Sequence, residues 1–250
     1  MSDRAEMDLQ KKRSAAKNDN SGHRSRVRQR FIMNGFEGML DYEVLEAMLM
    51  LALPRKDVKP LAKRLLAEYK TITGVISQPQ SELEKFPGLG TSSAAALRMF
   101  FEGMKFCLKE KLCESNLLET PEQLYNFMRM KLGVHRHECS MAVFLNSRNY
   151  LVGYEMLAEG TVDNVVNYSR NMVELAVHYN ASKMMLVHNH PSGVCAPTQE
   201  DIDATAASYN TLKSIGITLV DHLIVTPFEC FSFLDNGLIF RKQSIGENDR

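Results

Sequence analysis

Hydrophobic positions divide the chain into a helical first part and a mixed second part. In residues 28–113 apolar side chains recur at intervals of three and four, which predicts helices over 41–51, 57–69 and 91–111. Pro60 stands in the first turn of the second helix, where proline is tolerated. The helical pattern continues throughout this segment, so we expect residues 28–113 to form a helical domain.

The second part, residues 120–245, alternates strand and helix patterns. Short apolar runs bounded by turn residues predict strands, and longer periodic runs predict helices. The expected strands are 141–145, 150–158, 183–188, 217–226 and 230–234, and the expected helices are 121–132, 169–180 and 201–214. Strands alternating with helices predict an α+β fold of the α/β type, in which helices sandwich a sheet.

The first residues of the chain lack a hydrophobic period. Residues 1–30 contain nine Lys or Arg against four Asp or Glu, so we expect residues 1–27 to form a disordered basic tail. Over the whole chain 30 basic residues balance 30 acidic ones, and this neutral total gives no electrostatic case for a nucleic-acid partner. A solvated tail is the expectation, and weak binding to an anionic partner is the alternative.

Composition narrows the class of protein. Hydrophobic residues make up 44% of the 250 residues, enough for real cores, and no apolar run approaches the roughly 18 to 20 residues that span a bilayer. The five cysteines are odd in number and include no Cys-x-x-Cys pair, which argues against a disulfide framework or a zinc ribbon. We therefore expect a soluble cytoplasmic protein without a membrane partner.

The predicted strand over 183–188 ends in residues of the types that bind metals. His188 and His190 are separated by one residue, and because side chains alternate along a strand they face the same side. Asp201 opens the next predicted helix. Two imidazoles and a carboxylate form a three-ligand set suited to one Zn²⁺ ion per chain, with the fourth position open for chemistry.

Each of these features also has a purely structural interpretation. Histidines two apart on a strand are commonly hydrogen-bonded, and Thr198-x-x-Asp201 is also the pattern of a capping box. Asn189 must face the other side of the strand, so we expect it to brace the following loop. The combination of paired histidines, a proline turn and an aspartate favours a metal site over these separate explanations.

The spacing of the histidines, a proline, a hydroxyl residue and the aspartate resembles that of the JAMM (MPN-type) zinc metallopeptidases: His188, His190, Pro191, Thr198 and Asp201. The string His-Asn-His-Pro-Ser-Gly at 188–193, with residues 219–222, is similar to bacterial RadC-like proteins. This resemblance covers nearly all of the chain from residue 28. It implies a JAMM/MPN-like, cytidine-deaminase-like sheet over residues 120–245, in a zinc-dependent hydrolase of peptide or isopeptide bonds.

The resemblance implies roles for two further residues. In the JAMM family a glutamate on the strand that opens the domain is the base for the attacking water, and Glu138 matches that position. Thr198 stands where the family has a serine whose hydroxyl donates to the oxyanion. The same resemblance gives His188, His190 and Asp201 the role of zinc ligands.

Four other polar residues are weaker candidates. Asp221 and His222 are adjacent on a late strand, so at most one of them can approach the ion, and His222 is the candidate for a position behind the ligands. His135 and His137 precede Glu138. We expect these two histidines to be surface residues, because the three-ligand set is complete without them.

Residues 81–111 resemble a helix-hairpin-helix motif. Gly88 and Gly90 allow a tight turn, after which backbone N–H groups at the start of a helix could face a phosphate oxygen. Such a hairpin grips DNA without reading sequence. Related hairpins often carry Lys or Arg after the second glycine, but this chain has Thr91-Ser92-Ser93, so one phosphate contact is missing. Protein docking and a purely structural role are equal alternatives.

Two classes of function follow from these patterns. The first is a zinc-dependent hydrolase that acts on a peptide or protein substrate, with the helical domain recruiting substrate or nucleic acid. The second is a DNA-associated protein linked to repair or recombination, either a zinc-dependent nuclease or a non-catalytic module. In that class the hairpin at Gly88 and Gly90 would bind DNA non-specifically.

Overall fold

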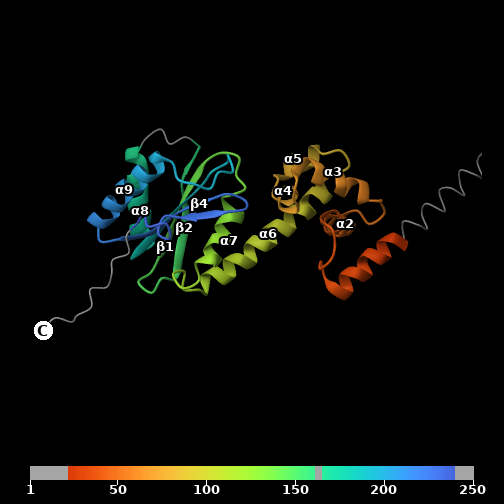
Figure 1. Ribbon diagram of the computed structural model, residues 1–250, viewed down its shortest axis with the longest axis horizontal. Coiled ribbons are helices and arrows are strands. Elements are labelled where there is room, and N and C mark those ends of the chain that lie inside the picture. The colour runs from red at the N-terminus through yellow and green to blue at the C-terminus, as the bar shows by residue number, and fades with distance from the viewer. Residues whose placement is uncertain (1–21, 161–164, 240–250) are drawn as a thin grey trace, which may run out of the picture. The chain divides into compact units, whose positions relative to one another are not determined.

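The computed structural model describes residues 22–160 and 165–239 (Figure 1). It divides into two compact units, Met1–Gly103 and Met104–Arg250. The sequence predicts that the helical domain ends at residue 113. The division instead falls within helix α6 (Thr91–Cys113). The physical reason is that the last turns of α6 carry Leu112, which is fully buried in the core of the second unit.

The first unit is helical through most of its described length. A helix of residues 22–34 is followed by α2 (Asp41–Ala52), α3 (Lys59–Tyr69), α4 (Ile72–Ile76), α5 (Gln80–Lys85) and the first part of α6. These helices pack their apolar sides together. The core that results contains fully or almost fully buried leucines from four of them: Leu45, Leu49, Leu65, Leu83 and Leu97.

The helical unit starts earlier than the predicted boundary at residue 28. Residues 22–27, which the charge pattern assigns to a disordered tail, belong to the first helix, and Val27 is buried. The basic residue Arg24 explains why: its guanidinium donates hydrogen bonds to three carbonyl oxygens at the end of α2 and beyond, at 2.8 to 3.2 Å. Arg24, which the charge pattern assigns to solvent, therefore holds the first helix against the end of α2 and the loop after it. The remainder of the predicted tail lies outside the described residues.

The second unit is built on a five-stranded sheet with the order β2-β1-β3-β4-β5. Its strands are β1 (Cys139–Leu145), β2 (Leu151–Glu159), β3 (Lys183–Asn189), β4 (Thr218–Val225) and β5 (Cys230–Ser232). Only the β3–β4 pair is parallel among these strands. The predicted α+β fold is confirmed.

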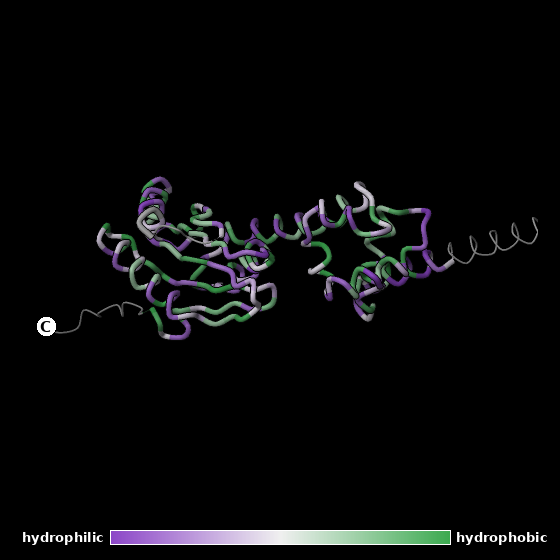
Figure 2. Tube along the Cα trace, turned by 90° about the horizontal axis from the view of Figure 1, so that it is seen from above, coloured by the Kyte–Doolittle hydropathy of each residue, from purple (hydrophilic) through white to green (hydrophobic). Residues whose placement is uncertain are grey.

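Helices cover both faces of this sheet (Figure 1). Helix α7 (Pro121–Lys131) packs on one face, and α8 (Val165–His178) and α9 (Gln199–Ser214) pack on the other. Green and purple stretches alternate along the helices in Figure 2, as expected for helices with one apolar and one polar side. Among the described residues, none of the helices is both long and apolar enough to cross a membrane.

Successive residues of the central strands enter opposite cores. In β3, Met185 and Val187 pack with α7, whereas Met184 and Leu186 pack with α8 and α9. A strand buried on both faces reads as a continuous apolar run, which explains its sequence. The even-numbered residues of β3 point to the face of α8 and α9, so this alternation fixes the side on which the next even-numbered residue, His188, must lie.

Candidate metal centre and hairpin pocket

Three side chains converge at the carboxyl end of β3. His188 is the next-to-last residue of β3, His190 is the first residue after the strand, and Asp201 lies in the first turn of α9. Nε2 of His188 is 3.1 Å from Oδ1 of Asp201, Nε2 of His190 is 3.4 Å from Oδ2, and the two Nε2 atoms are 2.9 Å apart. The structure thus brings together the three residues predicted as metal ligands.

The start of α9 holds the Asp201 carboxylate in place. The backbone N–H and the hydroxyl of Thr198 both donate to Oδ2 at 2.8 Å, and the Asp201 N–H donates back to the hydroxyl at 3.2 Å. Burial raises the pKa of Asp201, but contact with His188 and the bonds from Thr198 outweigh it and hold the pKa well below its usual range. The carboxylate is therefore ionised at neutral pH.

Thr198 has a single hydroxyl hydrogen, and in this structure that hydrogen is directed at Asp201. The predicted capping box is present. The hydroxyl orients the Asp201 carboxylate, so donation to an oxyanion would require the hydroxyl to turn. The role of Thr198 as an oxyanion donor stays a prediction.

The outer nitrogen of His190 faces a backbone carbonyl. Nδ1 is 2.9 Å from the oxygen of Val194, and a carbonyl oxygen only accepts hydrogen bonds. In the neutral ring Nδ1 therefore carries the hydrogen, which leaves the lone pair on Nε2. An outer hydrogen bond of this kind fixes the tautomer that a metal ligand needs.

A chain of three hydrogen bonds assigns the tautomer of His188. Thr205 donates its hydroxyl hydrogen to the backbone oxygen of Asp201 at 2.5 Å, so its oxygen must accept from Nδ1 of His222 at 2.6 Å. Nε2 of His222 then has the lone pair and accepts from Nδ1 of His188 at 2.8 Å. This donor count places the lone pair of His188 on Nε2, toward the site.

The chain requires an uncharged His222. Burial lowers the pKa of this imidazole to about 3, and nearby His188 adds to the effect. The neighbouring Asp221 faces away: its carboxylate accepts from the Ser232 hydroxyl at 2.6 Å and from the Leu234 N–H at 2.9 Å. Alternation along β4 thus sends one of the two adjacent residues, His222, toward His188.

The facing atoms fit a cation. In the assigned tautomers, Nε2 of His188, Nε2 of His190 and the Asp201 carboxylate all present lone pairs to one another at 2.9 to 3.4 Å. Acceptors at such distances repel unless something positive lies between them. Two imidazole nitrogens and one carboxylate oxygen are a ligand set that Zn²⁺ favours. These side chains are 9 to 18% exposed, so the site is shielded yet reachable.

Glu138 lies one residue before β1 and is exposed. Ser140 is the partner of His188 in the β1–β3 ladder, and cross-strand partners share a face. Continuing the alternation by two residues puts Glu138 on the face of His188. The Glu138 carboxylate is outside the group of converging ligand atoms, which is compatible with a role beside the ion and not on it.

Asn189 braces a different segment from the one predicted. Its Oδ1 accepts from the Cys139 N–H at 2.7 Å, and its Nδ2 donates to the carbonyl oxygens of His137 and His135 at 3.0 and 3.3 Å. The prediction that it braces the loop after β3 is therefore wrong. The reason is the antiparallel β1–β3 pairing, which puts residues 135–139 beside Asn189.

The hydrogen-bond chain predicts a specific effect on metal affinity. We expect His222→Ala and Thr205→Val to weaken Zn²⁺ binding by about 10- to 100-fold, because partners of this kind orient ligands and fix their tautomers. The matched control is Thr211→Val, which alters a hydroxyl of α9 that bonds only within the helix, to the Ala207 carbonyl. Competition with a chromophoric chelator measures the affinity, and unchanged values in both variants would contradict the assigned chain.

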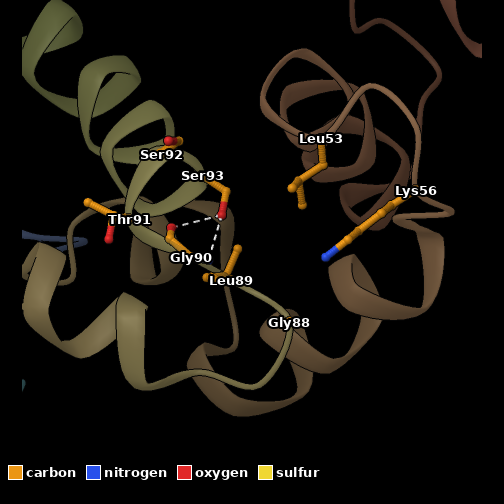
Figure 3. Close-up of a pocket in the computed structure, with 8 residues that line it drawn as sticks. All are labelled: Leu53, Lys56, Gly88, Leu89, Gly90, Thr91, Ser92 and Ser93. Carbon is orange, nitrogen blue, oxygen red and sulfur yellow. Dashed lines mark hydrogen bonds between the residues drawn. The ribbon is translucent and has the colours of Figure 1, made fainter.

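In the first unit, the hairpin between α5 and α6 borders a cavity of about 330 Å³ (Figure 3). Gly88 has φ +107°, and an added Cβ would lie 3.3 Å from Leu61 and Arg64, so this position favours glycine. Around Gly90 an added Cβ would meet nothing within 4 Å. The space beside Gly90 is therefore open to a ligand.

Two observations change the predicted phosphate contacts. Ser93 is buried, and its hydroxyl accepts from the Gly90 N–H and donates to the Gly90 carbonyl, both at 2.9 Å. The Gly90 N–H is thus already bonded. Because Ser93 is buried, a lysine or arginine at this position would not lie on the surface. A cation comes instead from Lys56, whose side chain reaches into the cavity from the loop after α2 (Figure 3).

Comparisons with known proteins identify relatives of this chain. A family model described as the RadC-like JAB domain matches residues 118–238. The chain is 34% identical over 228 residues to a UPF0758 protein of Fusobacterium nucleatum subsp. nucleatum, with 88% of this chain and 98% of the relative covered. UPF0758 proteins of Ruegeria pomeroyi and Rhodobacter capsulatus are 33% and 34% identical, with 87% and 85% of this chain and 97% and 100% of the relatives covered.

Proposed function

Since the chain belongs to the family of RadC-like proteins with a JAB domain, we propose that it is a zinc-dependent hydrolase of peptide or isopeptide bonds. One observation carries this proposal. Nε2 of His188, Nε2 of His190 and the Asp201 carboxylate face one another within 3.4 Å, while the outer nitrogens of both rings are bonded to other groups. The side chains are prepared to hold a cation.

His188, His190 and Asp201 would hold the zinc ion. When bound, zinc supplies a Lewis acid that acidifies water and polarises a carbonyl group. The protein's contribution is to keep the three ligands oriented: Thr198 donates to Asp201, while Val194 and His222 accept from the two imidazoles. Ligands fixed in this way need little rearrangement when substrate arrives.

Glu138 is the residue for proton transfer. Its carboxylate would take a proton from the attacking water and return it to the amine that leaves, so that a single side chain serves as base and then as acid. Its exposure suits a group that must reach both water and substrate. The three hydrogen bonds between the Asn189 side chain and the backbone of residues 135–139 restrict the segment that carries Glu138.

The choice between bond classes is tested with the purified full-length chain. We expect it to cleave peptide or isopeptide substrates in the presence of Zn²⁺, to lose this activity with chelator, and to leave duplex and single-stranded DNA intact. Cleavage of DNA by the zinc-loaded protein, with no peptide cleaved, would replace the proposal by a metal-dependent nuclease.

Lys56 and the cavity at the hairpin favour a second candidate function, the binding of DNA phosphates by the first unit. The cavity combines one cation, the hydroxyl residues Thr91 and Ser92 and the start of a long helix, α6. A helix start attracts anions through its dipole and its N–H groups. Contacts of this kind hold the nucleic-acid backbone without reading bases.

A substitution at Lys56 tests this second function. We expect Lys56→Ala to weaken binding of the full-length chain to duplex DNA equally for all sequences, and to reduce the slope of log affinity against log salt by about 1. Lys85→Ala is the matched control, because this exposed lysine of α5 pairs with Glu82 and does not line the cavity. Equal slopes for Lys56→Ala and the wild type would remove the hairpin as a phosphate site.

A further inference from the structure

A second group of metal-ligand side chains lies at the start of β1. It comprises His135, His137, Cys139 and Glu159, and one ligand atom from each lies within 4.8 Å of all the others. Of this group only the two histidines are singled out by the sequence, which predicts that they are surface residues. The structure leaves His137 exposed and His135 half-buried, and it groups both with the thiol of Cys139, the first residue of β1, and with the carboxylate of Glu159, the last residue of β2.

Two distances within this group are near those between the ligand atoms of a zinc ion. Sγ of Cys139 is 3.6 Å from Nδ1 of His135, and Nε2 of His137 is 3.0 Å from Oε1 of Glu159. Ligand atoms around zinc are about 3.3 to 3.8 Å apart, given bond lengths of about 2.0 to 2.3 Å. Cys139 and Glu159 are direct partners in the β1–β2 ladder, so the backbone itself sets two of the four positions side by side.

The exposure of the outer residues leaves room for the group to close on an ion. His137 and Glu159 have side chains that are 52 and 61% exposed, whereas Cys139 is buried and His135 is half-buried. Two ligands are therefore preset and two are free to move by the ångström or so that separates 4.8 Å from about 3.8 Å. A surface ion pair between His137 and Glu159 accounts for one contact but not for the thiol and imidazole beside it.

This group is distinct from the site at His188. The Cys139 side chain lies on the face of the sheet that α7 covers and belongs to the buried core there. His188 lies on the opposite face, which α8 and α9 cover. Between the two sites stands Asn189. Its side chain bonds to the backbone of His135, His137 and Cys139, while its chain neighbours are the two imidazole ligands of the other site.

We propose that His135, His137, Cys139 and Glu159 bind a second divalent metal ion, of the borderline-soft class to which Zn²⁺ belongs. The ligand set of two imidazoles, a thiolate and a carboxylate selects that class over Mg²⁺ or Ca²⁺, which take oxygen ligands. Its two negative charges neutralise a divalent ion. All four positions are filled by protein, which is typical of a structural ion and not of a catalytic one.

The ion at this site would fix the segment that carries Glu138. Ligands at His137 and Cys139 flank Glu138 in the chain, so an ion held by both leaves its backbone little freedom. The metal site does not depend on the proposed hydrolase. Only this consequence for Glu138 rests on the proposed function, and it concerns the positioning of a base and not its chemistry.

Cobalt substitution distinguishes the two sites, because only the second contains sulfur. We expect the full-length protein titrated with Co²⁺ to develop a near-ultraviolet thiolate-to-metal charge-transfer band. His190→Ala should keep this band, because it alters only the sulfur-free site. Cys139→Ser should lose it while the d–d bands of the first site persist. His137→Ala should weaken the Co²⁺ binding that produces the band by at least tenfold. Because His137 is exposed, this variant tests the site even if Cys139→Ser, at a buried position, fails to fold.

His178→Ala is the matched control, since this exposed histidine of α8 belongs to neither group. It should reproduce the wild-type titration. Absence of the charge-transfer band from the wild type at saturating Co²⁺ would overturn the proposal, and so would a band that survives in both Cys139→Ser and His137→Ala. Neither result would bear on hydrolysis at the first site, so failure of this proposal and failure of the proposed function are separable.

Discussion

Replacing His190 by alanine is expected to lower the zinc content by one ion per chain and to abolish hydrolysis. The reason is geometric: His190 is 93% buried, and its Nε2 is one of the three atoms that converge on the centre. Two remaining protein ligands rarely retain a catalytic zinc ion. Elemental analysis after dialysis, together with a peptide-cleavage assay, measures both effects.

Ser192→Ala is the matched control for His190→Ala. Ser192 is exposed in the same loop, and its hydroxyl accepts only from the Val194 N–H in the contacts described. We expect it to keep the zinc content and most of the activity. Equal zinc contents in His190→Ala and the wild type would show that this imidazole is no ligand.

The second large effect is expected for Glu138→Gln. Glutamine keeps the size and hydrogen-bonding capacity of the side chain but cannot take a proton at neutral pH. The rate of hydrolysis should fall by about 10²- to 10⁴-fold, the usual contribution of a general base. Zinc content should be unchanged, because the carboxylate lies outside the group of ligand atoms.

A matched charge removal separates chemistry from electrostatics. Glu200 is exposed in the first turn of α9, beside a metal ligand in the chain but outside the converging group. Glu200→Gln should therefore leave hydrolysis close to that of the wild type. Loss of zinc from Glu138→Gln would mean that Glu138 is a ligand and that another group acts as the base.

The convergence of His188, His190 and Asp201 could be predicted from the sequence because it depends on local geometry. Alternation along one strand puts His188 and His190 on the same face, and the capping pattern from Thr198 puts Asp201 in the first turn of the following helix. The apolar run that precedes them identifies a strand buried on both faces. These features need only a few residues on either side.

The network behind the ligands is not predictable in this way. The contact between His188 and His222 requires that β3 and β4 be parallel neighbours in a particular register, with Leu186 opposite His222. Thr205 joins the chain because it lies one turn after Asp201 on α9 and faces the sheet. Pairing between segments 34 residues apart is a property of the fold, and no local pattern specifies it.

Ser93 and Asn189 show the same limit from the other side. The sequence places Ser93 near the position where related hairpins often carry a cation, but in the structure Ser93 is buried and bonds to Gly90. Alternation predicts which face Asn189 takes, but not that the β1–β3 pairing brings residues 135–139 to that face. Direction can be predicted from local periodicity, whereas the identity of the partner depends on the tertiary structure.

We propose that the converging group at the end of β3 and Glu138 act together in hydrolysis. The most direct test incubates a peptide and isopeptide library with three samples: metal-free wild type, zinc-reconstituted wild type and zinc-reconstituted Glu138→Gln. Mass spectrometry of the products is expected to find new cleavage ends with the reconstituted wild type alone. Cleavage that is equally fast in all three samples, or no cleavage by a wild-type protein that demonstrably holds zinc at His188, His190 and Asp201, would contradict it.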